Sequence, residues 1–145
     1  MLEYIEIDDR VFRASPLENV FINFVSKDMR TDGGTTLAYN KLNPLMPRYV
    51  KKHEPKVGTA LRYNSETRKM VVYNIVVSDT NYRDPLLFDI QEALRDARTL
   101  IRKYGDKNIV FSKSNPMIED WDMVEPIIKK VFGNMDVKIK VYSRG

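Results

Sequence analysis

The sequence predicts an α/β fold in which one sheet carries helices on both faces. Strand patterns alternate with helical patterns along all 145 residues, which is typical of sheets whose strands are joined by crossover helices. Residues 20–25 are almost entirely apolar, as expected for a strand buried on both faces. The length suits one domain, residues 1–145.

The predicted elements follow in order from local patterns. Alternating polar and apolar residues predict a half-buried first strand over 2–7, which Asp8 and Asp9 should end. Turn-forming residues 64–67 predict a hairpin between two later strands. The other elements expected are strands at 20–25, 57–63, 69–77, 108–111 and 137–142, and helices at 35–42, 47–52, 85–104 and 121–132.

The two long helices have clear signals at their ends. Asp84 is expected to cap the first of them, with Pro85 at its first position and Gly105 after its last. Asp120 is expected to cap the second. Helical spacing predicts a buried face on the first helix, formed by Leu86, Leu87, Ile90, Leu94, Ala97 and Ile101.

The composition excludes several kinds of site. There is no cysteine, so disulfides, thiolate zinc sites and cysteine nucleophiles are excluded. His53 is the one histidine; His-rich metal sites are therefore excluded, and we expect no cofactor. No apolar run approaches the roughly 20 residues of a membrane span, and the acidic start is unlike a signal peptide. We expect a soluble, cytoplasmic protein with no membrane contact.

The net charge of +4 is modest evidence for an anionic partner. The densest basic cluster, residues 48–56, also contains Glu54, and no aromatic-interleaved recognition motif accompanies it. A solvated surface is therefore favoured there over a nucleic-acid patch.

Two loops are candidate ligand sites, because ligands of such sheets bind outside the carboxyl ends of strands. They are residues 26–34 and residues 112–119. In the first, Gly33 and Gly34 lie between a buried strand and a helix, where a phosphate suits the free N–H groups of the helix. A tight turn without a ligand is the alternative, since neither a Walker loop nor a GxGxxG fingerprint is present.

Residues 26–35, Ser-Lys-Asp-Met-Arg-Thr-Asp-Gly-Gly-Thr, resemble the Ser-x-Asp-x-Arg-Met-Gly-x-Gly segment of macro domains. The branch most similar contains terminal ADP-ribose protein glycohydrolase and the ADP-ribose-1''-phosphate phosphatases. Trp121 and the Lys-Ile-Lys-Val-Tyr run ending at Tyr142 resemble the family's last helix and strand. The resemblance implies a three-layer αβα fold that binds ADP-ribose.

The resemblance also implies roles for individual residues. Adenine would meet Asp9 and Tyr142, and the diphosphate would meet backbone N–H groups of Gly33, Gly34 and Thr35. The distal ribose would lie beside Asn23, Ser26 and Asp28, and the second loop would offer the side-chain donors Ser112, Ser114 and Asn115. Purely structural roles remain open for these residues: Asp9 as a polar strand end, Asn23 as a buried polar group and Tyr142 as a sheet residue.

The sequence departs from the family at the second loop and at the catalytic positions. Many members have a second glycine-rich loop, whereas residues 112–120 contain no glycine. The branch's catalytic lysine would fall near Ser78 and its aspartate near Met117, so the catalytic residues are unknown. Asp28, Glu119 and Asp120 remain candidate general bases, and Asp32 would repel a diphosphate unless its carboxylate turns away.

Three functions remain open. The first is a monomeric macro-like domain that binds ADP-ribose or ADP-ribosylated molecules, with or without hydrolysis of ADP-ribosyl esters or ADP-ribose 1''-phosphate. The second is a macro-fold interaction module that has lost the ligand site. The third is a basic α/β domain that binds nucleic acid.

Overall fold

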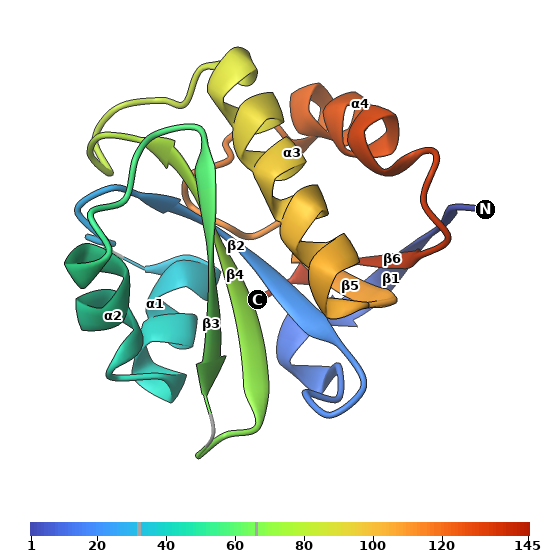
Figure 1. Ribbon diagram of the computed structural model, residues 1–145, viewed down its shortest axis with the longest axis horizontal. Helices are drawn as coiled ribbons and strands as arrows, with labels where there is room; N and C mark the ends of the chain where they lie inside the picture. Colours follow the sequence, from blue (N-terminus) through green and yellow to red (C-terminus); the bar gives the residue numbers. More distant parts are fainter. Residues whose placement is uncertain (32, 66) are drawn as a thin grey trace.

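The computed structural model describes residues 1–31, 33–65 and 67–145 and has the predicted α/β architecture. Six strands form one sheet in the order β1-β6-β5-β2-β4-β3 (Figure 1). Neighbouring strands are parallel except β3, which pairs antiparallel with β4. The strands are β1 Glu3–Arg10, β2 Val20–Ser26, β3 Thr59–Ser65, β4 Met70–Ser78, β5 Asn108–Ser112 and β6 Lys138–Arg144.

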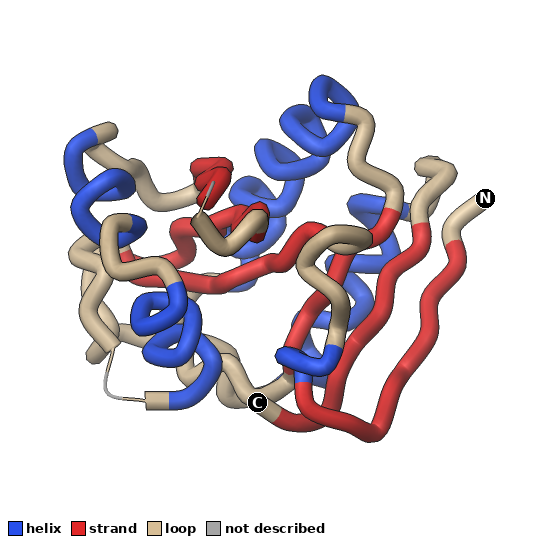
Figure 2. Tube along the Cα trace, turned by 90° about the horizontal axis from the view of Figure 1, so that it is seen from below, coloured by secondary structure: helices blue, strands red, loops and turns tan. Residues whose placement is uncertain are grey.

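Helices cover both faces of this mixed sheet, as predicted (Figure 2). One face carries α3 (Leu87–Tyr104) and α4 (Trp121–Phe132), and the other carries α1 (Gly34–Leu42), α2 (Met46–Lys52) and the short 3-10 helix η1 (Val11–Arg13). In the described part of the chain, no helix has the length and apolar character needed to cross a membrane.

Each face of the sheet has its own hydrophobic core, and the inner strand β2 is therefore buried on both sides. Phe24 points to the core under α3 and α4, where Phe111 contacts Phe24, Trp121 and Phe132. Phe21 points to the core under α1, where it packs against Tyr39. The apolar run at 20–25 therefore follows from burial on both faces.

The structure corrects several local predictions. The first strand does not end at Asp8 but continues to Arg10, and Asn64 belongs to β3 rather than to the hairpin turn. The long helix begins at Leu87, after an extended Leu86, with no side-chain cap from Asp84 and no proline at its first position. The predicted buried face fails at its start for the same reason: Leu86 and Leu87 are 67% and 42% exposed.

The hydroxyl of Tyr39 gives a first prediction. Tyr39 is fully buried, burial raises its pKa, and its hydroxyl has no hydrogen-bond partner among the described residues. Tyr39→Phe is therefore expected to leave the free energy of unfolding unchanged or raise it by about 1 kcal/mol, because a buried donor without a partner is removed. Urea unfolding measures this.

Tyr73→Phe is the matched control, since the Tyr73 hydroxyl donates to Asp106 at 2.5 Å. Loss of a hydrogen bond to a carboxylate should lower the free energy of unfolding by about 1.5–3 kcal/mol. If Tyr39→Phe and Tyr73→Phe lowered the free energy of unfolding equally, the Tyr39 hydroxyl could not be a buried donor without a partner.

Candidate functional site

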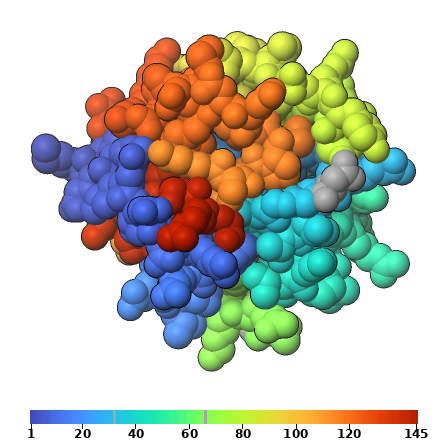
Figure 3. Space-filling view, turned by 180° about the vertical axis from the view of Figure 1, so that it is seen from behind, coloured from blue at the N-terminus to red at the C-terminus, as the bar shows by residue number. Residues whose placement is uncertain are grey.

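The candidate site lies where the parallel strands end. The carboxyl ends of β1, β6, β5, β2 and β4 all point to one edge of the sheet. Both predicted ligand loops, 26–34 and 112–119, leave the sheet at this edge. Figure 3 shows the face formed there, with the last residues of the chain in red between the blue N-terminal segment, the orange second loop and cyan α1.

The first loop is a tight turn held by Asp28. The Asp28 carboxylate accepts hydrogen bonds from the Ser26 hydroxyl and, at 3.1 Å, from the Arg30 N–H. Met29 is buried and takes a φ of 59°, a left-handed conformation that L-residues rarely adopt. Such backbone strain occurs often at functional sites. Ser26 is buried, whereas Asp28 remains half-exposed at the edge of the sheet.

The N-terminus of α1 follows the first loop. Gly33, its N-cap, has no side chain to bond the first N–H groups of the helix. Thr35 is 1% exposed, and its Oγ1 has no hydrogen-bond partner in residues 1–31, 33–65 and 67–145. Free N–H groups and a buried free hydroxyl beside a positive helix end favour an anion. Asp32 lies outside the described residues, so its predicted effect stays a prediction.

The second loop packs directly on the N-terminus of α1. Gly34 has a φ of +65°, and a Cβ there would lie 2.9 Å from both Pro116 Cδ and the carbonyl oxygen of Ser114. Only glycine fits this close approach without displacement of the loop. The close neighbour of Gly34 is thus the second loop, whereas the phosphate expected at the glycine pair stays a prediction.

Asn115 fixes the second loop to the sheet. Its amide donates to Asn23 Oδ1 at 3.3 Å and to the Phe24 carbonyl at 3.1 Å, and its Oδ1 accepts from the Met117 N–H at 2.9 Å. Asn23 in turn donates to Asn74 Oδ1 at 3.4 Å. All three asparagines are buried. The side chains of Asn23 and Asn115, which sequence analysis places at the ligand, thus bond one another.

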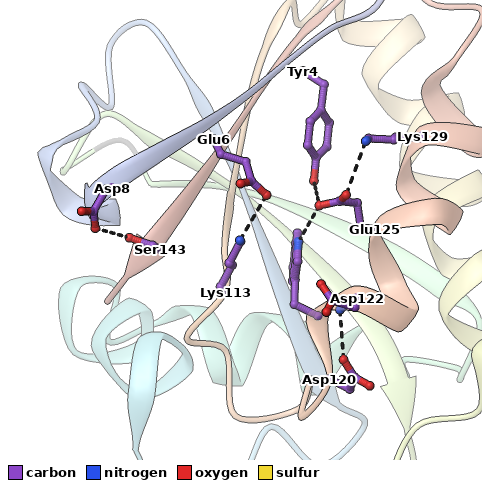
Figure 4. Close-up of polar contacts among 10 residues, drawn as sticks. Tyr4, Glu6, Asp8, Lys113, Asp120, Asp122, Glu125, Lys129 and Ser143 are labelled. Atoms are coloured by element: carbon purple, nitrogen blue, oxygen red, sulfur yellow. Dashed lines mark hydrogen bonds and ion pairs between the residues drawn. The ribbon is translucent and has the colours of Figure 1, made fainter.

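Ser112, Lys113 and Ser114 of the second loop also have polar partners. The hydroxyls of Ser112 and Ser114 lie 2.9 Å apart in a hydrogen bond. The Lys113 ammonium forms an ion pair with Glu6 at 3.1 Å (Figure 4). Gly145 lies against this loop, since a Cβ there would be 2.7 Å from Ser114 Oγ and 3.2 Å from Thr35 Cγ2.

Asp9 and Tyr142 lie together at the β1–β6 end of the edge. The two strands are paired there, with Ile7 opposite Tyr142. Burial raises the pKa of the Tyr142 hydroxyl, and the negative charge of Asp9 raises it further. Asp9 is also ion-paired with Arg13 at 3.3 Å. The structure thus brings together the two residues expected at adenine, separated along the edge from Asp28, which follows the inner strand β2.

The other two candidate general bases, Glu119 and Asp120, are not part of the turn that Asp28 holds. Asp120 caps α4 as predicted, by accepting the Asp122 N–H at 3.1 Å (Figure 4). Glu119 is exposed beside it. Ser78, at the position of the branch's lysine, is buried and donates to the Arg83 carbonyl at 3.0 Å. Among the described residues, Asp28 is the carboxylate on the first loop itself.

A separate polar cluster anchors α4 to β1. Glu125 accepts hydrogen bonds from the Tyr4 hydroxyl at 2.9 Å and from Trp121 Nε1 at 3.3 Å, and pairs with Lys129 (Figure 4). The bond from Tyr4 is the main cause that lowers the pKa of Glu125. Trp121 is buried, so this cluster holds the helix in place. In the described ranges, no group of three or more acidic, histidine or cysteine residues could hold a metal ion.

Sequence reasoning missed three residues that shape the site. Pro116 and Gly145 cover the N-terminus of α1, and Met29 carries the strained turn. Pro116 had a signal, since Asn-Pro favours a turn. The position of Gly145 depends on the sheet order, which places β6 beside β5. Met29 had no signal, because methionine does not favour a positive φ.

Several solved structures with the same architecture are macrodomains. The macrodomain of Mycobacterium tuberculosis DarG has a TM-score of 0.83 at 19% identity, covering 100% of this chain and 99% of that one. The macrodomain of Thermus aquaticus DarG has a TM-score of 0.79 at 17% identity, covering 99% and 98%. Thermosipho africanus DarTG in complex with ADP-ribose has a TM-score of 0.75 at 15% identity, covering 92% of this chain and 39% of that one.

The chain therefore has the macrodomain fold, which is the fold that the sequence resemblance implied. Comparisons with models of protein families and with curated proteins give no match.

Proposed function

We propose that this protein binds ADP-ribose or ADP-ribosylated molecules at the carboxyl edge of its sheet. The observation that carries the proposal is the N-terminus of α1, where uncapped N–H groups, the buried free hydroxyl of Thr35 and the close approach at Gly34 coincide. A diphosphate suits this position, because it accepts several backbone N–H bonds and interacts favourably with the helix dipole.

The residues on either side of the proposed diphosphate position offer groups that suit the adenine and the distal ribose of ADP-ribose. Tyr142 offers an aromatic ring and Asp9 a carboxylate that can accept an amino group of adenine. Asp28 and Ser26 lie on the other side, where hydroxyl groups of a ribose would find acceptors and donors. The similar Thermosipho structure, described as a complex with ADP-ribose, supports the same class of ligand here.

A more specific proposal is that the protein also hydrolyses its ligand. We propose Asp28 as the general base, since it is the carboxylate on the first loop and is half-exposed at the edge. A base at this position would activate water toward an ADP-ribosyl ester or ADP-ribose 1''-phosphate, the substrates of the branch that the first loop resembles. The cytoplasmic location and the monomeric state stay predictions from the sequence.

Calorimetric titration tests binding. ADP-ribose is expected to bind with a micromolar Kd, with AMP and ribose 5-phosphate at least tenfold weaker, because each fills one end of the site and only part of the diphosphate position. No heat with millimolar ADP-ribose would contradict the proposal and favour an interaction module that has lost the site. Salt-dependent binding of RNA or DNA without a response to ADP-ribose would favour the nucleic-acid alternative.

A turnover assay on the two branch substrates tests hydrolysis separately. If Asp28→Asn forms no product but still binds ADP-ribose, the role of Asp28 as general base is supported. Equal rates of product formation in the variant and the native protein would contradict that role.

A further inference from the structure

A second surface combines acidic charge with exposed apolar side chains. The stretches 79–92 and 114–128 together carry eight acidic residues and one basic residue, in a chain with 24 basic and 20 acidic residues in all. The basic residue, Arg83, is ion-paired with Asp79 at 3.6 Å. Figure 3 shows the two stretches, yellow-green and orange, side by side along the upper edge of the molecule.

Two hollows flank the segment that leads into α3. One, of 180 Å³, lies between α3 and α4 and has Leu87, Met117, Ile118 and Met123 in its lining. The other, of 430 Å³, lies on the opposite side of the segment and has Leu86 in its lining. Asp84 borders both hollows. The two hollows and the segment between them form one surface, which we term the α3–α4 groove.

Large apolar side chains are exposed along this groove. Leu86, Leu87 and Met123 line the hollows and are 67%, 42% and 51% exposed. Tyr82 and Phe88, on the segment between the hollows and at the start of α3, are 77% and 67% exposed but line neither hollow. The face of α3 that packs on the sheet begins only at Ile90, so the core does not account for the apolar residues before it. Contiguous exposed apolar residues with a charged rim are typical of protein-binding surfaces.

We propose that the α3–α4 groove binds a basic, amphipathic segment of a partner protein. The apolar side chains of that segment would fill the hollows beside Leu86 and Leu87, and its Lys and Arg residues would lie against the acidic rim formed by Asp84, Asp89, Glu119 and Asp120. Charge complementarity selects this occupant. It also argues against nucleic acid, since phosphates would meet a rim of carboxylates.

Three synthetic peptides of 16 residues test the chemistry of the occupant. The first is an amphipathic helix with Leu and Phe on one face and Lys and Arg on the other; the second replaces Lys and Arg by Glu; the third replaces Leu and Phe by Ser. Fluorescence anisotropy is expected to show binding of the first peptide at least tenfold tighter than of the others, and weaker binding at high salt. Equal binding of all three would overturn the proposal.

Variants of the whole chain locate the site. Leu87→Ser with Met123→Ser, and separately Asp84→Lys with Glu119→Lys, should each weaken the first peptide at least tenfold. Leu45→Ser and Asp136→Lys are matched controls, because Leu45 is 68% exposed and Asp136 is 88% exposed in its side chain and both lie outside the groove. If the groove variants lost no more affinity for the first peptide than the controls, the proposal would be overturned.

Two further results would overturn it in favour of another occupant. Concentration-dependent dimerisation that the Leu87 and Met123 variant abolishes, with no peptide binding, would assign the groove to a second copy of the chain. Binding of single-stranded DNA that the Leu87 and Met123 variant weakens would assign it to nucleic acid. Unchanged unfolding curves of both variants show that the fold is intact.

Discussion

Gly34→Ala is expected to weaken ADP-ribose binding at least tenfold, which corresponds to about 1.4 kcal/mol or more. The added Cβ would lie 2.9 Å from Pro116 Cδ and from the Ser114 carbonyl oxygen. Because the clash involves backbone and a proline ring, the second loop must move away from α1. That movement displaces the N–H groups on both sides of the proposed diphosphate position. Calorimetric titration with ADP-ribose measures the effect.

Gly105→Ala is the matched control. Gly105 has a φ of +72°, close to the +65° of Gly34, but a Cβ there meets nothing within 4 Å. Both substitutions carry the left-handed backbone penalty of about 1–2 kcal/mol, which urea unfolding measures. Only Gly34→Ala adds the clash with the second loop. If the two variants bound ADP-ribose equally, the contact between α1 and the second loop would have no role in binding.

The fold was predictable because its signals are local. The apolar run at 20–25 predicts a strand buried on both sides, and β2 is buried throughout. The turn residues before Met70 predict a hairpin, and β3 pairs antiparallel with β4; Glu66 in that turn lies outside the described residues. In each case a short stretch of sequence determines the element, whereas the strand order β1-β6-β5-β2-β4-β3 was not predicted.

The start of α3 shows where local signals fail. Asp84 and Pro85 satisfy the rules for a helix start, yet the helix begins at Leu87. The preceding loop is fixed by other contacts: Ser78 donates to the Arg83 carbonyl, and Arg83 pairs with Asp79. These local contacts fix the loop just before Asp84, and the chain stays extended at Leu86 in spite of the capping signal.

The proximity of the two candidate loops was predictable, and the hydrogen bonds within them were not. The carboxyl-edge rule selects both loops, and the structure places Gly34 of the first loop against Ser114 and Pro116 of the second. The hydrogen bond between Asn23 and Asn115 joins residues 92 positions apart. No spacing in the sequence encodes such a contact, because it arises only when β5 pairs beside β2.

Asn115→Leu is expected to lower the free energy of unfolding by about 2–4 kcal/mol, because three hydrogen bonds of about 1 kcal/mol each are lost and their partners stay buried. Those partners are Asn23 Oδ1, the Phe24 carbonyl and the Met117 N–H. Leucine is similar in size, so the loss reflects the missing bonds more than a cavity. ADP-ribose affinity should fall as well, since the second loop is no longer fixed over α1. Urea unfolding and calorimetry measure the two effects.

A double-mutant cycle with Asn23→Leu separates the shared bond from the rest. If Asn115 and Asn23 stabilise the loop through their mutual hydrogen bond, the double variant loses less than the two single losses added together, with a coupling of about 0.5–3 kcal/mol. Ser114→Ala is the control in the same loop, because its hydroxyl bonds only within the loop, to Ser112, and should couple with neither asparagine. Strict additivity of Asn23 and Asn115 would mean that each acts through its other partners, Asn74 for the one and the backbone of Phe24 and Met117 for the other. The second loop would then be fixed by its contacts with backbone groups, and Asn23 would act through its bond to Asn74.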